Sequence, residues 1–91
     1  MTILNKVARA FQISPHSLLR ESLRTYLKQK LNLVESEMFI LAKKYGVQNV
    51  FELDARVQQG LFHEQDTSED YFRMDYLEAE RDKIKLLMDT L

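Results

Sequence analysis

The sequence predicts an all-α protein, folded as a long antiparallel helical hairpin with a short N-terminal helix and a short connector helix. Apolar residues recur at steps of three and four along two long stretches, which is the periodicity of one helix face. Gly and Pro, which end or interrupt helices, number only two and one in 91 residues. Hydrophobic residues make up 45% of the chain and charged residues 30%, a balance typical of a folded, helix-rich protein. A chain of this size forms a single domain, 1–91.

Residues 2–12 are predicted to form the short first helix. Thr2 or Asn5 caps its N-terminus, because both side chains can accept a hydrogen bond from a free backbone N–H. Gln12 and Ile13 form the turn that follows. Five apolar residues share one face of this helix: Ile3, Leu4, Val7, Ala8 and Phe11.

A long second helix is predicted over Pro15–Tyr45. Ser14 supplies its N-cap, Pro15 takes the first helical position, and Gly46 supplies the left-handed residue after its end. At the rise of an α-helix this element is about 45 Å long, whereas a compact domain of this size spans about 30 Å. We therefore expect it to protrude unless a second chain covers it. Its apolar stripe consists of Leu19, Leu23, Leu27, Leu31, Val34, Met38, Leu41 and Tyr45.

A connector helix is predicted over Val50–Gln59, with Asn49 as its N-cap and Gly60 after its end. Its apolar face consists of Val50, Leu53 and Val57. Phe51 and Phe62 are expected in the core at this end of the hairpin. The alternative is that they belong to an exposed partner site.

The last helix is predicted from Glu69 to near Leu91, after an acidic loop over 61–67 and a cap from Thr67 or Ser68. Arg81 interrupts its apolar stripe. We expect the partner of Arg81 to be Glu35 or Glu37 on the facing helix, unless its guanidinium reaches solvent. The stripe consists of Met74, Leu77, Arg81, Ile84, Met88 and Leu91.

The two apolar stripes are candidate oligomer or partner interfaces, pairing either within one chain or between chains. A small chain without cysteine lacks disulfides and thiolate metal sites, and such chains often gain burial by oligomerising. A homodimer is therefore expected. The apolar interface candidates are Leu19, Leu23, Leu27, Leu31, Val34, Met38, Leu41, Tyr45, Met74, Leu77, Ile84, Met88 and Leu91.

Charge divides the chain into two parts. Residues 1–31 hold six basic residues and one acidic residue, a net +5, and residues 32–91 hold seven basic and thirteen acidic residues, a net −6. This division favours a polyanion at the basic part and a protein partner at the acidic part. The alternative is that this division of charge arose by chance on the helical surfaces of a small protein and has no functional meaning.

The stretch Lys6–Arg20 is similar to the helix-turn-helix signature of DNA-binding proteins. Val7 and small Ala8 match the positions of the first helix at which two helices cross closely, and Leu18 matches the buried position of the second. Gln12 stands where that signature usually has a turn glycine. Extended to Leu27, the stretch also resembles the two helices of ribbon-helix-helix antitoxins. The resemblance covers residues 5–30, a third of the chain.

The resemblance implies that the basic part binds DNA through the start of the second helix. Arg20 would then read a guanine edge, and most of the other basic residues would contact phosphate. The alternative for each residue is an ordinary solvated surface. The DNA-binding candidates are Lys6, Arg9, His16, Ser17, Arg20, Arg24 and Lys28.

No enzyme, cofactor or metal site is predicted. Asp75, Glu78 and Asp82 share a helix face, but Glu35 and Glu37 stand two residues apart and supply no second acidic motif of the kind that holds Mg²⁺. The chain has two histidines, and neither lies in a recognisable nucleophile motif, so no catalytic site is predicted from them.

No apolar run reaches membrane-spanning length, so a cytoplasmic location is expected. Two functions follow as alternatives. One is a small DNA-binding or antitoxin-like regulator, with DNA at its basic part and a protein partner at its acidic part. The other is a helical homodimeric interaction module that binds no nucleic acid.

Overall fold

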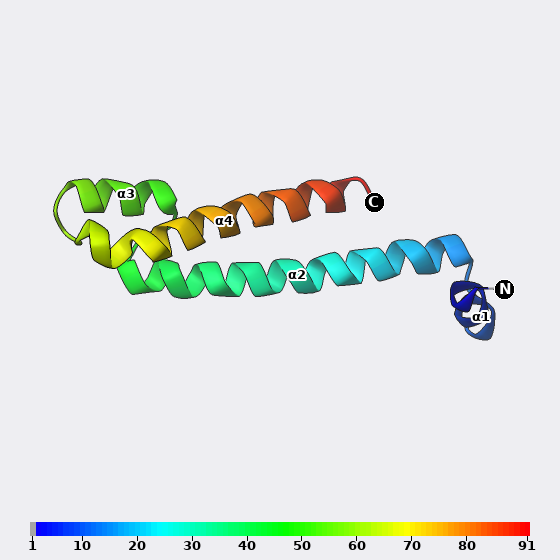
Figure 1. Ribbon diagram of the computed structural model, residues 1–91. Coiled ribbons are helices and arrows are strands. Elements are labelled where there is room, and N and C mark those ends of the chain that lie inside the picture. Colours follow the sequence, from blue (N-terminus) through cyan, green and yellow to red (C-terminus); the bar gives the residue numbers. More distant parts are fainter. Residues whose placement is uncertain (1) are drawn as a thin grey trace.

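The protein is an extended all-helical rod (Figure 1). The computed structural model describes residues 2–91, except for the side chain of Glu64, and this part of the chain contains no β-strand. Its Cα atoms extend 61 × 19 × 18 Å. The helices are α1 (Ile3–Ala10), α2 (Pro15–Tyr45), α3 (Val50–Gln58) and α4 (Glu64–Asp89). The predicted fold class is confirmed.

Local hydrogen bonds set the ends of the first helices where the sequence predicts them. The Thr2 hydroxyl accepts from the Asn5 N–H at 3.2 Å, and the Ser14 hydroxyl accepts from the Ser17 N–H at 3.0 Å. Gly46 ends α2 with φ +65°, a conformation that favours glycine. The Val47 N–H then donates back to the Ala42 carbonyl at 2.9 Å. These caps explain why the 31-residue helix α2 begins at Pro15 and ends at Tyr45.

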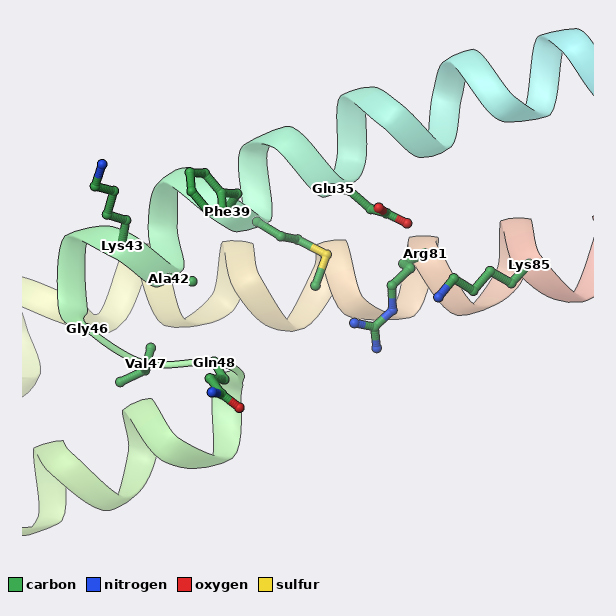
Figure 2. A pocket seen from close by; sticks show the side chains of 10 residues that line it. Glu35, Phe39, Ala42, Lys43, Gly46, Val47, Gln48, Arg81 and Lys85 are labelled. Atoms are coloured by element: carbon green, nitrogen blue, oxygen red, sulfur yellow. The ribbon is translucent and has the colours of Figure 1, made fainter.

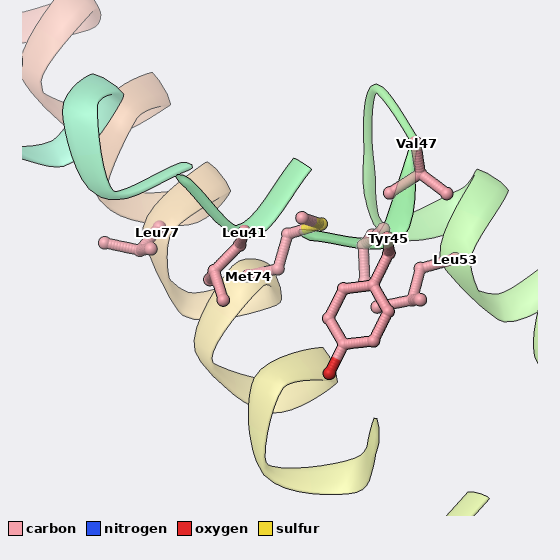
Figure 3. Packing of buried hydrophobic residues seen from close by; sticks show 7 residues of the cluster. Leu41, Tyr45, Val47, Leu53, Met74 and Leu77 are labelled. Carbon is pink, nitrogen blue, oxygen red and sulfur yellow. The ribbon is translucent and has the colours of Figure 1, made fainter. Parts of the chain in front are cut away.

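Helices α2 and α4 pack antiparallel within one chain, and α3 covers the end of the hairpin (Figure 1). The stripe of α2 contributes its last residues to the core, and α4 contributes its own stripe from the other side. Figure 3 shows this packing of side chains from three helices. The buried cluster consists of Leu41, Tyr45, Val47, Val50, Leu53, Met74 and Leu77.

The two predicted stripes are therefore joined within the chain over part of their length. Helix α4 ends short of the start of α2, where α1 lies instead (Figure 1). Most apolar members of the two stripes are buried or half-buried: Leu27, Leu31, Val34, Met38, Leu41, Tyr45, Met74, Leu77, Ile84, Met88 and Leu91. Leu19 and Leu23, at the start of the α2 stripe, remain exposed.

The start of α4 differs from the prediction, because the helix begins at Glu64 rather than Glu69. His63 takes the cap position, and its carbonyl accepts from the backbone N–H groups of Asp66 and Thr67. The Thr67 hydroxyl donates to that same carbonyl at 3.0 Å, and Thr67 is only 3% exposed. Thr67 thus lies inside the first turn and does not cap the helix.

The expected core position of Phe51 is wrong, because its side chain is 79% exposed. Val50 and Leu53 face α4, and the residue directly after Val50 points away from that face. Phe62 is half-buried and packs against the Tyr45 ring, edge to face, with the ring centroids 5.2 Å apart.

The expected partner of Arg81 is also wrong. Arg81 pairs with its neighbour Asp82 at 3.0 Å, and Glu37 pairs with Arg73 instead. The register of the hairpin explains the difference, because Arg81 lies eight residues, or about 12 Å, further along α4 than Arg73. Glu35 and Arg81 both line an open groove between α2 and α4.

Candidate nucleic-acid interface

The candidate DNA-binding residues lie on α1 and on the first half of α2. All of them have exposed side chains, as contact with a phosphate backbone requires. They are Lys6, Arg9, His16, Ser17, Arg20, Arg24 and Lys28. Ser17 is the member whose hydroxyl is already engaged, since it accepts a hydrogen bond from the Ser14 hydroxyl at 2.9 Å.

The turn between α1 and α2 contains a left-handed backbone conformation that glycine usually adopts, although the residue at that position is glutamine. Gln12 has φ +58°, and it is the only non-glycine residue with positive φ in the described part of the chain. The Ile13 N–H donates to the Ala8 carbonyl at 2.9 Å, which closes the turn. Ala8 is 1% exposed where α1 packs on α2. This turn brings α1 against α2, with the small side chain of Ala8 buried.

Arg20, Arg24 and Lys28 follow one another at steps of four, so they lie along one side of α2. His16 continues this series toward the start of the helix, where helix N-termini of DNA-binding modules approach the bases. The spacing from His16 to Lys28 corresponds to about 18 Å of helix. This side of α2 is thus a continuous basic strip with a length comparable to half a turn of DNA.

The basic residues of this end have no carboxylate partner within the part of the chain that the structure describes. Every ion pair found there lies between residues 37 and 83. Glu21 is the single acidic residue among residues 1–31. Lys30 contacts the ring of Tyr26 instead, with its Nζ 5.7 Å from the ring centroid. The positive charge of the α1 end is therefore uncompensated and open to an external anion.

The acidic residues at the opposite end are partly used to hold the hairpin together. Asp70 accepts hydrogen bonds from Lys44 at 2.6 Å and from the Tyr45 hydroxyl at 2.5 Å. These bonds, that of Lys44 first, lower the pKa of the Asp70 carboxyl. Glu78 accepts from the Val50 N–H at 2.8 Å and so anchors the start of α3 on α4. These carboxylates have structural partners, in contrast to the cations of the α1 end.

An open groove of about 750 Å³ lies between α2, α4 and the turn that joins α2 to α3. Figure 2 shows Glu35, Arg81 and Lys85 together toward one end of it. Met38, Ala42 and Val47 add apolar surface. The groove thus combines apolar surface with charges of both signs.

The carboxylates that share one face of α4 are partly engaged with other groups of the chain. Glu78 is bonded to the Val50 N–H and Asp82 pairs with Arg81, so two of the three candidate carboxylates already have partners. Among residues 2–91, leaving aside the side chain of Glu64, no group of three or more His, Cys, Asp or Glu residues is placed to hold a metal ion. No helix in that part of the chain is long and apolar enough to cross a membrane.

The sequence reasoning missed a second apolar series on α2, which shares only Leu19 with the predicted stripe and which we call the α2 row. Its members follow one another at steps of seven and are 45%, 56%, 73% and 64% exposed: Leu19, Tyr26, Leu33 and Ile40. Because a seven-residue step returns to nearly the same side of a helix, these residues form one line along the outside of the hairpin. The signal was present in the sequence, but the denser stripe that packs on α4 obscured it.

Comparison with known proteins places the chain in one family. The model of the Uncharacterized protein MJ0235 family matches residues 1–91, so the chain belongs to that family. No curated protein and no protein of known structure matches it.

Proposed function

We propose that this family member is a small, non-enzymatic DNA-binding regulator of the antitoxin-like kind, acting in the cytoplasm. Its α1 end binds the DNA backbone, and its acidic α3 end binds a protein partner. One observation carries the proposal: the basic residues at the α1 end lack carboxylate partners among the described residues, whereas the ion pairs lie in the rest of the chain. A cluster of exposed, unpaired cations at one end of a rod is suited to a polyanion.

The proposal assigns different tasks to the basic residues. Arg20, near the start of α2, reads a guanine edge through bidentate hydrogen bonds from its guanidinium. Arg24 and Lys28 contact phosphates. Lys6 and Arg9 on α1 extend the phosphate contacts beside the helix start. Contacts to phosphate supply affinity for any duplex, whereas Arg20 supplies sequence preference.

Fluorescence anisotropy on duplex DNA, titrated from about 50 to 300 mM salt, tests the proposal. Binding should weaken linearly on a log–log scale, with a slope of about −0.9 for each phosphate neutralised. Replacing Arg20, Arg24 and Lys28 together by Ala should make that slope shallower by about 1.8, because Arg24 and Lys28 are the two members of this set that contact phosphates. The matched control replaces Lys43, Lys83 and Lys85 by Ala, which changes the net charge equally at other positions and should leave the slope unchanged.

Two results would contradict DNA binding at the α1 end. One is the absence of binding at the lowest salt concentration. The other is an equal loss in the two triple variants, which would mean that overall charge and not this strip determines the affinity. Arg20→Ala alone should reduce the preference between duplex sequences more than it reduces affinity for random DNA.

The second candidate function is a helical homodimeric interaction module without nucleic acid. The observation that favours it is the large number of exposed apolar side chains, which include Ile3 on α1, Phe11 directly after α1, and the whole α2 row. Exposed apolar surface of this extent marks an interaction site. Failure of the anisotropy experiment, together with a dimeric mass, would select this function.

A further inference from the structure

The single chain exposes more surface than a folded monomer of its size. Its accessible surface is 7051 Å². A folded monomer of 10.8 kDa is expected to expose about 5,500 Å². The excess of about 1,500 Å² is larger than the roughly 800 Å² that each partner contributes to a standard protein interface. An additional chain can therefore be accommodated with a full interface on each copy.

The α2 row is the part of this surface that is arranged for another helix. It runs along about 32 Å of α2, with no proline or glycine between its first and last residues. The stripe facing α4 shares only Leu19 with the row, and its last residues Leu41 and Tyr45 are buried in the core. Occupation of the row by a partner would thus leave the fold of the chain unchanged.

The spacing of the row makes it complementary to itself in an antiparallel arrangement. A two-fold axis between Gln29 and Lys30 exchanges the outer two members, Leu19 and Ile40. The same axis exchanges the inner two members, Tyr26 and Leu33. Every member then faces an apolar residue of the second copy, as an isologous interface requires.

Charge favours the antiparallel orientation over a parallel one. A parallel pair would place two parts of net charge +5 side by side and two of −6 side by side, whereas an antiparallel pair places opposite charges together. Near the axis the two Lys30 side chains approach each other. Each lies over its own Tyr26 ring, with Nζ 5.7 Å from the centroid, and its ammonium remains free to reach solvent.

We propose that two copies of the chain form an antiparallel dimer in which the α2 rows pack against each other. Apart from Leu19, with which both series begin, the stripe that packs on α4 takes no part in this interface. The dimer depends on α2 alone and is independent of the proposed DNA binding. Association and DNA binding are measured separately, so failure of one proposal leaves the other standing.

Sedimentation equilibrium tests association, with the oligomeric mass as its readout. The wild-type protein should have twice the chain mass of 10.8 kDa at micromolar concentration. Leu33→Glu should raise the dimer dissociation constant by about a hundredfold, because it places a carboxylate against the partner's apolar row. The matched control is Leu86→Glu, which alters an equally apolar side chain on α4 that is 68% exposed and lies outside the row.

Circular dichroism should show the same helix content in both variants, because Leu33 is also largely exposed in the single chain. A monomeric wild type would overturn the proposal and leave the row to a different protein. An equal effect of the two substitutions would likewise overturn it, since the row would then have no special part in association.

Disulfide cross-linking tests the orientation, because the natural chain has no cysteine. Ser22 and Ser36 are exposed on the same side of the row, and the two-fold axis places Ser22 of one copy within about one helical residue of Ser36 in the other. A mixture of Ser22→Cys and Ser36→Cys proteins should form a mixed disulfide dimer under mild oxidation. Each variant alone should remain largely uncross-linked. Efficient cross-linking of Ser22→Cys with itself would indicate a parallel pair and overturn the antiparallel arrangement.

Discussion

At the level of a single residue, Tyr45 takes part in the core, in an aromatic contact and in a hydrogen bond between α2 and α4. Its ring packs in the core cluster and against Phe62, while its hydroxyl donates to Asp70 at 2.5 Å. Burial first, and then this hydrogen bond, raise the pKa of Tyr45. The hydrogen bonds from Lys44 and Tyr45 lower the pKa of Asp70. The last turn of α2 is thereby fastened to the beginning of α4.

Tyr45→Phe should lower the free energy of unfolding at pH 7 by about 1.5 kcal/mol, the usual contribution of a hydrogen bond to a charged group. The folded pKa of Asp70 lies below its unfolded value, which is about 3.9. The stabilisation is therefore complete above pH 4 and is lost as the pH falls through the folded pKa. Urea denaturation across pH 3 to 7 measures it, and the difference between wild type and variant should shrink in acid.

Tyr76→Phe is the control for this measurement. Tyr76 is 54% exposed, and its ring contacts Arg73 in a way that phenylalanine preserves. Its effect should stay within about 0.5 kcal/mol at every pH. A Tyr45→Phe variant with a pH-independent loss would show that its hydroxyl acts through something other than the Asp70 carboxylate.

At the level of an element, α3 is attached to the hairpin through one face. Leu53 is fully buried beside Met74 and Leu77, the Val50 N–H donates to Glu78, and Arg56 donates to the Tyr45 carbonyl at 3.3 Å. The opposite face of α3 carries Phe51 in solvent. This short helix is therefore held by its packing, since nine residues form too short a helix to be stable alone.

Leu53→Ala should lower the free energy of unfolding by about 2–5 kcal/mol, because it leaves a cavity in the core. Phe51→Ala, two residues away, removes a larger side chain and should change it by less than about 0.5 kcal/mol. Thermal or urea denaturation of the two variants measures both effects. Comparable losses at the two positions would mean that α3 packs with a different face toward α4.

Helix existence was predictable from the sequence because the signals are local. Ser14, Gly46 and Asn49 act on neighbouring backbone groups, so the caps that they form could be inferred without knowledge of the rest of the fold. Thr67 has the same capping chemistry as Ser14, yet it lies within α4. The choice between cap and first turn depended on the burial of Thr67, which is a tertiary property.

Pairing between elements was less predictable than their existence. The facing stripes indicated that α2 and α4 pack together, but not the register that joins Glu37 to Arg73 and leaves Arg81 with Asp82. For the candidate site, the residue types and their exposure could be inferred from charge and helical spacing. The left-handed conformation of Gln12 could not, since glutamine gives no local signal for it.

At the level of the whole molecule, packing and charge are distributed unevenly along the rod. The core cluster lies at the α3 end, together with much of the acidic charge, whereas the α1 end is basic and buries little apolar surface. The rod is therefore stabilised by packing mainly at its α3 end. The α1 half of the rod can bury more apolar surface by association with another chain. The antiparallel dimer would place the α1 end of each copy beside the well-packed α3 end of the other copy.

This arrangement predicts the shape of the particle in solution. Two rods side by side in opposite directions keep a maximum Cα dimension close to the 61 Å of one chain, whereas association through the rod ends would roughly double it. Small-angle X-ray scattering at micromolar concentration should thus show doubled mass with a radius of gyration only slightly above 19.2 Å. Because opposite charges lie together, raising salt from 50 to 500 mM should shift the scattering toward monomer. A doubled length, or a dimer strengthened by salt, would contradict side-by-side antiparallel packing.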